Sequence, residues 1–315
     1  MPFVREKFIL DSPKKATIFL QQTLKITQKE AQKMIDKGRV ECNGAIFSQK
    51  AGFLCGEVIV SYFRVDATGL KPIFETADFA LFDKPAGLLT HPKGRFSHAS
   101  LLDSIRFYLG ANANPINRLD SETSGLVLVS KNKKSEVILK RRFEIREVEK
   151  TYLAVVFGRI NIVNLAQKFG ESIIAPRESN ADSHDFIINL PLKVGQKGTD
   201  LGIRTYIDKN GRFAQSAIKI LHYDSARNIT HLKIMPLTGR THQIRAHLAH
   251  IGHRIVGEML YGVDDKNARD FLDGKISGEM RTQIFGANRL MLHAQSLRFC
   301  FKGNAFFIRS KMDFN

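Results

Sequence analysis

The sequence predicts an α+β protein with a small N-terminal unit and a larger second domain. Apolar residues recur at helical spacing between residues 16 and 36, and a hairpin signal follows them. Short runs of β-branched and aliphatic residues, such as residues 126–129, recur along the rest of the chain and are typical of buried strands. With 315 residues, the chain has the length for two domains and a sizeable core.

The N-terminal unit is predicted to span residues 12–62. Its apolar spacing predicts a first helix over residues 16–24. Thr27 and Glu30 have the spacing of a capping box, which predicts the start of a second helix. Gly38 is suited to end that helix in a left-handed conformation.

A hairpin and a linker follow the two helices. Asn43 and Gly44 favour a two-residue turn between short strands, and residues 58–60 form a further strand. Residues 63–75 break the local pattern and are expected to be a linker. Residues 76–315 are then the second domain.

The second domain mixes strands and helices along its length. Strands are expected at residues 79–83, 126–129, 149–157, 218–223 and 231–235, and residues 289–299 form a late strand or turn. Helices are expected at residues 100–110, at the basic segment 132–147 and from Thr241 onward. Residues 160–215 give no clear pattern and are consistent with an insertion.

Charge and cysteine usage narrow the class of protein. The formal net charge is +17, from 48 Lys and Arg against 31 Asp and Glu, and this excess favours polyanionic partners such as nucleic acid. The cysteines, Cys42, Cys55 and Cys300, have neither metal-site nor disulfide-framework spacing, as expected in a reducing compartment. Without a signal-like start or an apolar run of ~18 residues, we expect a soluble cytoplasmic protein, by default a monomer.

The most distinctive stretch is the polar loop 117–125, which leads directly into the apolar run 126–129. The loop therefore presents Arg118 and Asp120 immediately before a strand that ties it to the core. Rigid scaffolds often present reactive groups in this way. The alternative is that Asp120 only bonds its own backbone in a turn, and this stretch alone does not separate the two interpretations.

Four histidines between residues 242 and 253 suggest a metal site at first sight: His242, His247, His250 and His253. They do not form the His-Glu-x-x-His pattern of a zinc site, and no cysteine lies near them. The chain also has no glycine-rich phosphate-binding loop. We therefore expect neither a metal nor a cofactor.

Five segments, in the same order along residues 75–300, resemble the RluA-type family of RNA pseudouridine synthases. They are Lys84–Leu88 with His91-Pro92, Arg118–Asp120 with Thr123–Leu126, Lys150–Tyr152, Thr238–Arg245 with Gly252-His253 and Tyr261-Gly262, and Leu292–Ala294. The segment 32–40, with Asn43-Gly44 behind it, resembles the S4 RNA-binding module. The chain departs from the family by having Asn117 in place of the usual His and by lacking His-Pro after Leu297.

The resemblance implies a fold, a reaction and a set of roles. The second domain would contain a curved, mostly antiparallel mixed sheet flanked by helices, and it would isomerise uridine in RNA to pseudouridine. Asp120 would be the essential carboxylate, with Arg245 paired to it. Tyr152 would stack on the uracil and assist proton removal from C5. Arg118 would enter the RNA stack to help flip the base, and Leu292 would form part of the apolar floor.

Several alternatives stay open from the sequence. Lys29, Lys33, Lys37 and Arg39 form an RNA-binding face of the S4-like module or only a solvated surface. Large-subunit ribosomal RNA is the expected target, with transfer RNA second. A non-catalytic RNA-binding or ribosome-assembly factor would not need Asp120, and a nucleoside hydrolase would need a second carboxylate such as Glu122. Tyr152 as a core residue and Arg245 as a phosphate ligand are the simpler interpretations of those two.

Overall fold

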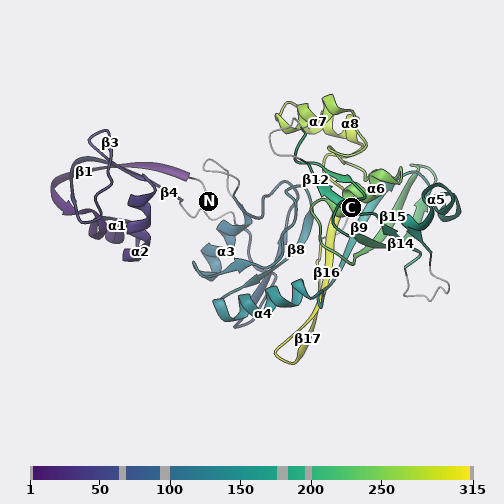
Figure 1. Ribbon diagram of the computed structural model, residues 1–315, viewed down its shortest axis with the longest axis horizontal. Coiled ribbons are helices and arrows are strands. Elements are labelled where there is room, and N and C mark those ends of the chain that lie inside the picture. Colours follow the sequence, from purple (N-terminus) through teal and green to yellow (C-terminus); the bar gives the residue numbers. More distant parts are fainter. Residues whose placement is uncertain (1–2, 64–68, 93–99, 176–183, 196–200, 313–315) are drawn as a thin grey trace. The chain divides into compact units, whose positions relative to one another are not determined.

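The computed structural model describes residues 3–63, 69–92, 100–175, 184–195 and 201–312 (Figure 1). The chain folds as two compact units, one comprising residues 1–69 and 91–107 and the other residues 70–90 and 108–315. The first division falls inside the expected linker, of which residues 64–68 lie outside the described part of the chain. Residues 91–107, expected in the second domain, are grouped with the first unit.

Two helices and a four-stranded sheet make up residues 3–63, which we call the N-terminal unit. The elements are β1 (Phe3–Lys15), α1 (Ala16–Leu24), α2 (Gln28–Asp36), β2 (Val40–Cys42), β3 (Ala45–Ile46) and β4 (Phe53–Phe63), with strand order β1-β4-β2-β3. β1 was not predicted, and it extends the unit toward the N-terminus from the expected start at residue 12. Much of β1 is polar and exposed, so its sequence lacks the apolar pattern of a strand.

Local signals in this unit form the structures that they predict. The Thr27 hydroxyl accepts the Glu30 N–H at 3.3 Å, and the Glu30 carboxylate accepts the Thr27 N–H at 2.9 Å. Asn43 and Gly44 both have positive φ, 51° and 81°, as a two-residue hairpin turn requires. The capping box and the hairpin are therefore confirmed.

The second unit contains a mixed, mostly antiparallel sheet, as the fold class predicts. Its strand order is β10-β11-β14-β15-β9-β16-β8-β6-β5, with β17 paired to β16 and β7 to β8. The bounds are β5 (Phe74–Glu75), β6 (Phe79–Lys84), β7 (Asn114–Pro115), β8 (Ser124–Ser130), β9 (Glu149–Phe157), β10 (Ile173–Ile174), β11 (Phe186–Asn189), β14 (Gln215–Asp224), β15 (Ile229–Pro236), β16 (Leu292–Phe301) and β17 (Asn304–Arg309). A separate pair is formed by β12 (Leu192–Val194) and β13 (Thr205–Ile207).

The helices after the N-terminal unit are α3 (Leu101–Leu109), α4 (Lys133–Glu144), α5 (Ile162–Phe169), α6 (Gln243–His250), α7 (Asp265–Leu272) and α8 (Gly278–Phe285), with a 3₁₀ turn at Gly170–Ser172. α7 and α8 lie beside each other (Figure 1). α5, α7 and α8 were not predicted. α6 begins after the expected Thr241 because His242, its N-cap, has left-handed backbone angles. No helix in the described ranges has the length and apolar character needed to cross a membrane.

A parallel strand pair inside this largely antiparallel sheet positions the functional loop. β8 and β16 run parallel, with Ser124 opposite His293 and Gly125 opposite Ala294. A Cβ at Gly125 would lie 2.4 Å from the Ala294 carbonyl oxygen, so only glycine allows this approach. Tyr152 on β9 also pairs with Ala294. The loop before β8, the start of β16 and Tyr152 therefore meet at one place in the sheet.

Candidate active site

The turn after β6 supports the loop that carries Asp120. Lys84 is fully buried, and its ammonium group donates to the carbonyl oxygens of Pro85, Leu88 and Ser121 at 2.9, 2.8 and 2.9 Å. The Gly87 N–H also donates to the Ser121 carbonyl, at 2.8 Å. Two of the family-like segments, residues 84–88 and the loop that carries Asp120, are thus held together by hydrogen bonds.

Lys84 is buried without a direct ion pair in the described residues. Burial lowers its pKa to about 7, and the nearby charges of Glu122 and Asp120 oppose that decrease. Three carbonyl acceptors use all three N–H groups of an ammonium ion, so the geometry matches the charged form.

Asn117 and Thr90 anchor the beginning of the same loop. The Asn117 side chain accepts the Leu128 N–H at 2.8 Å and donates to the Leu126 carbonyl at 3.2 Å, so it bonds the backbone of β8. The Thr90 hydroxyl donates to the Leu119 carbonyl at 2.8 Å. The residue that departs from the family pattern therefore has a structural task here.

Arg245 links Asp120 to a carboxylate in the core. Its Nε and Nη2 donate to the two oxygens of Glu258 at 2.7 Å each, and its Nη1 donates to Asp120 Oδ2 at 3.2 Å. Arg245 is 3% exposed and Glu258 is 0% exposed. The fork-to-fork geometry fixes the guanidinium in orientation as well as in charge. The expected pairing of Arg245 with Asp120 is thus present.

The Arg245 guanidinium is positively charged. Burial alone would lower the pKa of Arg245, but the carboxylates of Glu258 and Asp120 more than offset that effect and raise it. Because the group is buried and bonds these two carboxylates, it does not fit the alternative of a surface phosphate ligand.

His242 and Tyr261 complete the surroundings of Asp120. His242 Nε2 lies 3.6 Å from Asp120 Oδ2, and its Nδ1 lies 2.8 Å from the Tyr261 hydroxyl oxygen. That oxygen accepts the Thr205 N–H at 2.7 Å. Burial lowers the pKa of His242 and raises the pKa of Tyr261 to about 12.

Tyr152 and Leu292 lie against the main core, and Arg118 lies outside it. Leu292 is 3% exposed and Tyr152 packs against the cluster that contains it. Burial, followed by the charge of Asp120, raises the pKa of Tyr152, so its side chain is a neutral phenol. Arg118 is exposed, two residues from Asp120.

Sequence comparison decides the family. A sequence model of the family described as RNA pseudouridylate synthase matches residues 78–250, which cover the loop, Tyr152 and α6. The chain belongs to this family. The synthase is 42% identical over 313 residues to an uncharacterized RNA pseudouridine synthase of Helicobacter pylori strain J99, covering 99% of this chain and 97% of that protein.

Other relatives carry more specific names. The ribosomal large subunit pseudouridine synthase D of Pseudomonas aeruginosa is 29% identical, covering 72% of this chain and 67% of the relative. A mitochondrial tRNA pseudouridine(32) synthase of Saccharomyces cerevisiae is 32% identical, covering 64% and 39%. The solved human RNA Pseudouridylate Synthase Domain Containing 1 shares the fold, with a TM-score of 0.55, 23% identity, and coverage of 80% and 86%.

The second carboxylate of the loop has a different partner. Glu122 accepts a bond from Arg281 on α8 at 2.6 Å, whereas Asp120 is held by Arg245. Glu122 is thus committed to α8, which does not fit a hydrolase with two cooperating carboxylates. The sequence does not predict the roles of Arg281 and Glu258, because the residues that they pair with, Glu122 and Arg245, are distant along the chain.

The histidines around α6 serve separate structural bonds in the synthase. His247 lies 3.1 Å from the Ser216 hydroxyl and 2.9 Å from the Leu190 carbonyl oxygen, and His253 lies 3.0 Å from the Phe157 carbonyl oxygen. Within the described ranges, no group of three or more His, Cys, Asp or Glu side chains is placed to hold a metal ion.

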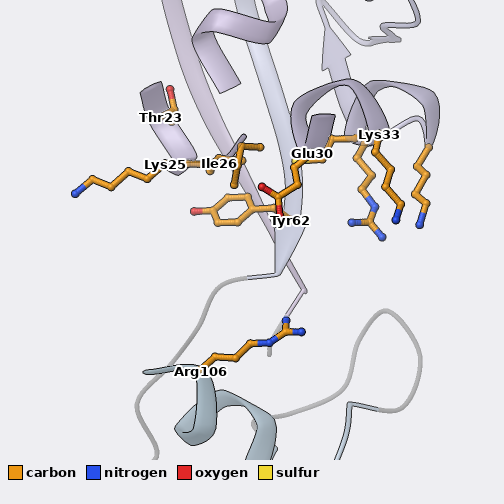
Figure 2. A pocket seen from close by; sticks show the side chains of 11 residues that line it. Thr23, Lys25, Ile26, Glu30, Lys33, Tyr62 and Arg106 are labelled. Carbon is orange, nitrogen blue, oxygen red and sulfur yellow. The ribbon is translucent and has the colours of Figure 1, made fainter. Parts of the chain in front are cut away.

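The lysines expected to face RNA lie on the surface of the N-terminal unit. Lys29, Lys33 and Lys37 are exposed and Arg39 is partly buried. Lys33, Lys37 and Arg39 line one pocket together with Lys25, Glu30 and Tyr62, and Lys29 is not part of that lining. Figure 2 shows Glu30 beside Tyr62, and Lys33 farther along the same helix.

Proposed function

We propose that this synthase isomerises specific uridines in large-subunit ribosomal RNA, with Asp120 as the essential carboxylate. The observation that carries the assignment is the asymmetric binding of that group. Oδ2 accepts the bond from the buried guanidinium of Arg245, whereas in the described part of the chain no hydrogen bond reaches Oδ1. The side chain of Asp120 is 29% exposed, so Oδ1 is the oxygen available to a substrate.

The reaction is an isomerisation, so no group is transferred to the RNA from another molecule, and the enzyme has to supply a correctly positioned carboxylate. The N1–C1′ bond breaks, the uracil turns, and a C5–C1′ bond forms. C5 loses a proton and N1 gains one, so the composition of the RNA is unchanged. Asp120 acts by attacking the base or C1′, or by removing a sugar proton. In each case an ionised carboxylate is required, and the Arg245 guanidinium holds it in position through Oδ2.

Tyr152 is best suited to stack on the uracil. An aromatic ring beside the carboxylate can stack on the flat face of the uracil. The raised pKa of Tyr152 makes the phenolate scarce at neutral pH, which favours stacking over direct abstraction of the C5 proton by a phenolate. Leu292, buried at the start of β16, supplies apolar floor.

The target uridine must leave the stack of neighbouring bases to reach Oδ1, which costs roughly 2–4 kcal/mol. Arg118 is exposed beside the carboxylate and is the residue proposed to fill the vacated position. The N-terminal unit, as an S4-like module, would hold the RNA through Lys29, Lys33, Lys37 and Arg39. The net charge of +17 supports a polymeric substrate over a free nucleoside.

The names of two relatives support two targets. The ribosomal large subunit enzyme of Pseudomonas aeruginosa covers more of this chain than the yeast transfer RNA enzyme does, 72% against 64%. This difference favours ribosomal RNA, and transfer RNA is the second candidate. The proposal places the synthase in the cytoplasm, acting as a monomer without metal or cofactor.

Mapping pseudouridines in a strain that lacks the gene tests the proposal. Carbodiimide-dependent primer-extension stops would be compared in ribosomal and transfer RNA, then after complementation with wild type, Asp120→Asn or the exposed control Asp273→Asn. We expect a ribosomal stop that disappears on deletion and returns with wild type and the control only. A stop restored by Asp120→Asn would exclude the catalytic assignment, and one that disappears only from transfer RNA would change the target.

A further inference from the structure

Two side-chain nitrogen atoms lie near the same oxygen of Asp120, Oδ2. Arg245 Nη1 lies 3.2 Å from Oδ2, and His242 Nε2 lies 3.6 Å from it. The resemblance to the family gave a role to Arg245 and none to His242. If Nε2 carries a proton, His242 can donate a hydrogen bond to the Asp120 carboxylate. If Nε2 carries a lone pair, it repels that carboxylate.

The partners of Tyr261 determine the tautomer of His242. The Tyr261 oxygen accepts the Thr205 N–H at 2.7 Å and lies 2.8 Å from His242 Nδ1. The Tyr261 O–H is then free to donate, and His242 Nδ1 and the Thr205 hydroxyl both lie near it. The Thr205 hydroxyl can itself donate to the Tyr261 oxygen, and Nδ1 then receives the Tyr261 O–H. A neutral imidazole carries a single proton, so a bare Nδ1 leaves that proton on Nε2, toward Asp120.

The imidazole is also neutral and held in place. Burial is the largest cause that lowers the pKa of His242, and Arg245 adds to it, while Asp120 and Glu258 oppose it. The backbone of His242 is left-handed, with φ 53° and ψ 18°. Such a conformation costs a non-glycine residue on the order of 1 kcal/mol, and it persists where the surroundings determine the position of the side chain.

We propose that His242 is a positioning residue for the isomerisation, an N–H donor that holds Asp120 through Oδ2 together with Arg245. The proposal rests on the role proposed above for Asp120. Distances in free active sites often shorten when substrate binds, so a gap of 3.6 Å becomes a hydrogen bond in the RNA complex. With Oδ2 held from two sides, Oδ1 stays directed at the uridine. Tyr261 and Thr205 act through His242.

Two substitutions separate the two nitrogens of the ring. The amide nitrogen of Gln reaches the position of His Nε2, and that of Asn reaches only the position of Nδ1. His242→Asn should therefore lower the single-turnover rate by about 10- to 100-fold, the value of a hydrogen bond to a charged group, with KM and RNA affinity unchanged. His242→Gln should recover most of that loss, to within about threefold of wild type.

Backbone strain predicts the opposite order. Asn adopts left-handed angles more readily than Gln, so a purely structural role would make His242→Gln the worse variant. The matched control is His250→Asn, the same change at the exposed end of α6, which should leave the rate unaltered. A wild-type rate in His242→Asn, or equal losses in the Asn and Gln variants, would overturn the proposal.

Nuclear magnetic resonance tests the tautomer without any substrate. In the full chain labelled with ¹⁵N-histidine, the signals absent from His242→Gln identify the ring, and long-range ¹H–¹⁵N correlations give its tautomer. We expect the neutral Nε2–H form at pH 8, well above the ordinary pKa of histidine, with an Nε2 signal that shifts in Asp120→Asn. An Nδ1–H form would refute the proposal. If wild type modified no RNA tested, the proposed target would fail while this measurement still decided the place of His242.

Discussion

The synthase has basic groups of two kinds, and the surroundings of each determine what a substitution does. Around the Asp120 loop, Lys84 and Arg245 are buried, and each bonds particular carbonyl or carboxylate oxygens. On the N-terminal unit, Lys33 and Lys37 are exposed and share one surface. Buried charges give exact geometry, and removing one partner is costly. Exposed charges are interchangeable, weak one at a time, and screened by salt.

Replacing Glu258 should have the largest effect, because it leaves the Arg245 guanidinium buried with only Asp120 opposite. Glu258→Gln should lower the free energy of unfolding by about 3–5 kcal/mol and abolish activity. Urea denaturation measures the first and single-turnover assays the second. Glu279→Gln, on the exposed part of α8, is the control and should change neither. A loss below about 1 kcal/mol would mean that another group compensates the guanidinium.

Acid should destabilise the buried network through His247. Burial lowers the pKa of His247 to about 4 in the folded protein, so the unfolded chain binds more protons between the ordinary value near 6.5 and about 4. Stability due to the neutral ring is present above 6.5 and is lost as pH falls through this window, by about 3 kcal/mol in total.

His247→Gln has no titrating group there, so its unfolding free energy should fall less steeply than that of wild type between pH 6.5 and 4. Urea midpoints at several pH values give both slopes. His222→Gln, on the exposed part of β14, should keep the wild-type slope. Equal slopes for wild type and His247→Gln would show that this ring is not what makes the core acid-labile.

Gly125→Ala tests how closely β8 and β16 approach. The added methyl would lie 2.4 Å from the Ala294 carbonyl oxygen, so the two strands must separate, at a cost of about 1–3 kcal/mol. Asp120 stands just before this pair, so activity should fall more than stability suggests. Gly110→Ala has a comparable positive φ with nothing within 4 Å of its Cβ, and it separates backbone strain from the clash. Equal losses in both would remove the packing argument.

The elements that could be predicted from the sequence are those with a local cause. The capping box at Thr27 and Glu30, the Asn43-Gly44 hairpin and the buried strand after Gly125 each depend on neighbours a few residues away. β1 depends on pairing with β4, and the polar composition of β1 conceals that partner. α7 and α8 cannot be predicted for a similar reason, since both are short and mostly polar, and each buries a single residue, Ala268 and Phe285.

The candidate site divides in the same way. The identities of Asp120, Tyr152 and Arg245 followed from resemblance, and the structure adds the distance between two residues 125 positions apart. Tyr261 is itself a motif residue and Glu258 lies three positions before it, but the role of each depends on the donors that reach its oxygen atoms. A carboxylate that fixes an arginine looks in sequence like any other, so only the fold could assign Glu258.

Lys33→Gln should have the smallest effect, which is what the exposed setting of the N-terminal lysines implies. Removing one cation from the RNA backbone should weaken binding by less than about tenfold and reduce the slope of log K against log salt by about 0.7–0.9. Lys33→Gln/Lys37→Gln should double the change in slope and leave the rate of bound RNA intact. Lys50→Gln is the control, because Lys50 is paired with Asp36 and does not line that pocket. An unchanged slope in the double variant would mean that this surface does not bind RNA, and a reduced rate of bound RNA would mean that the two kinds of basic group are coupled.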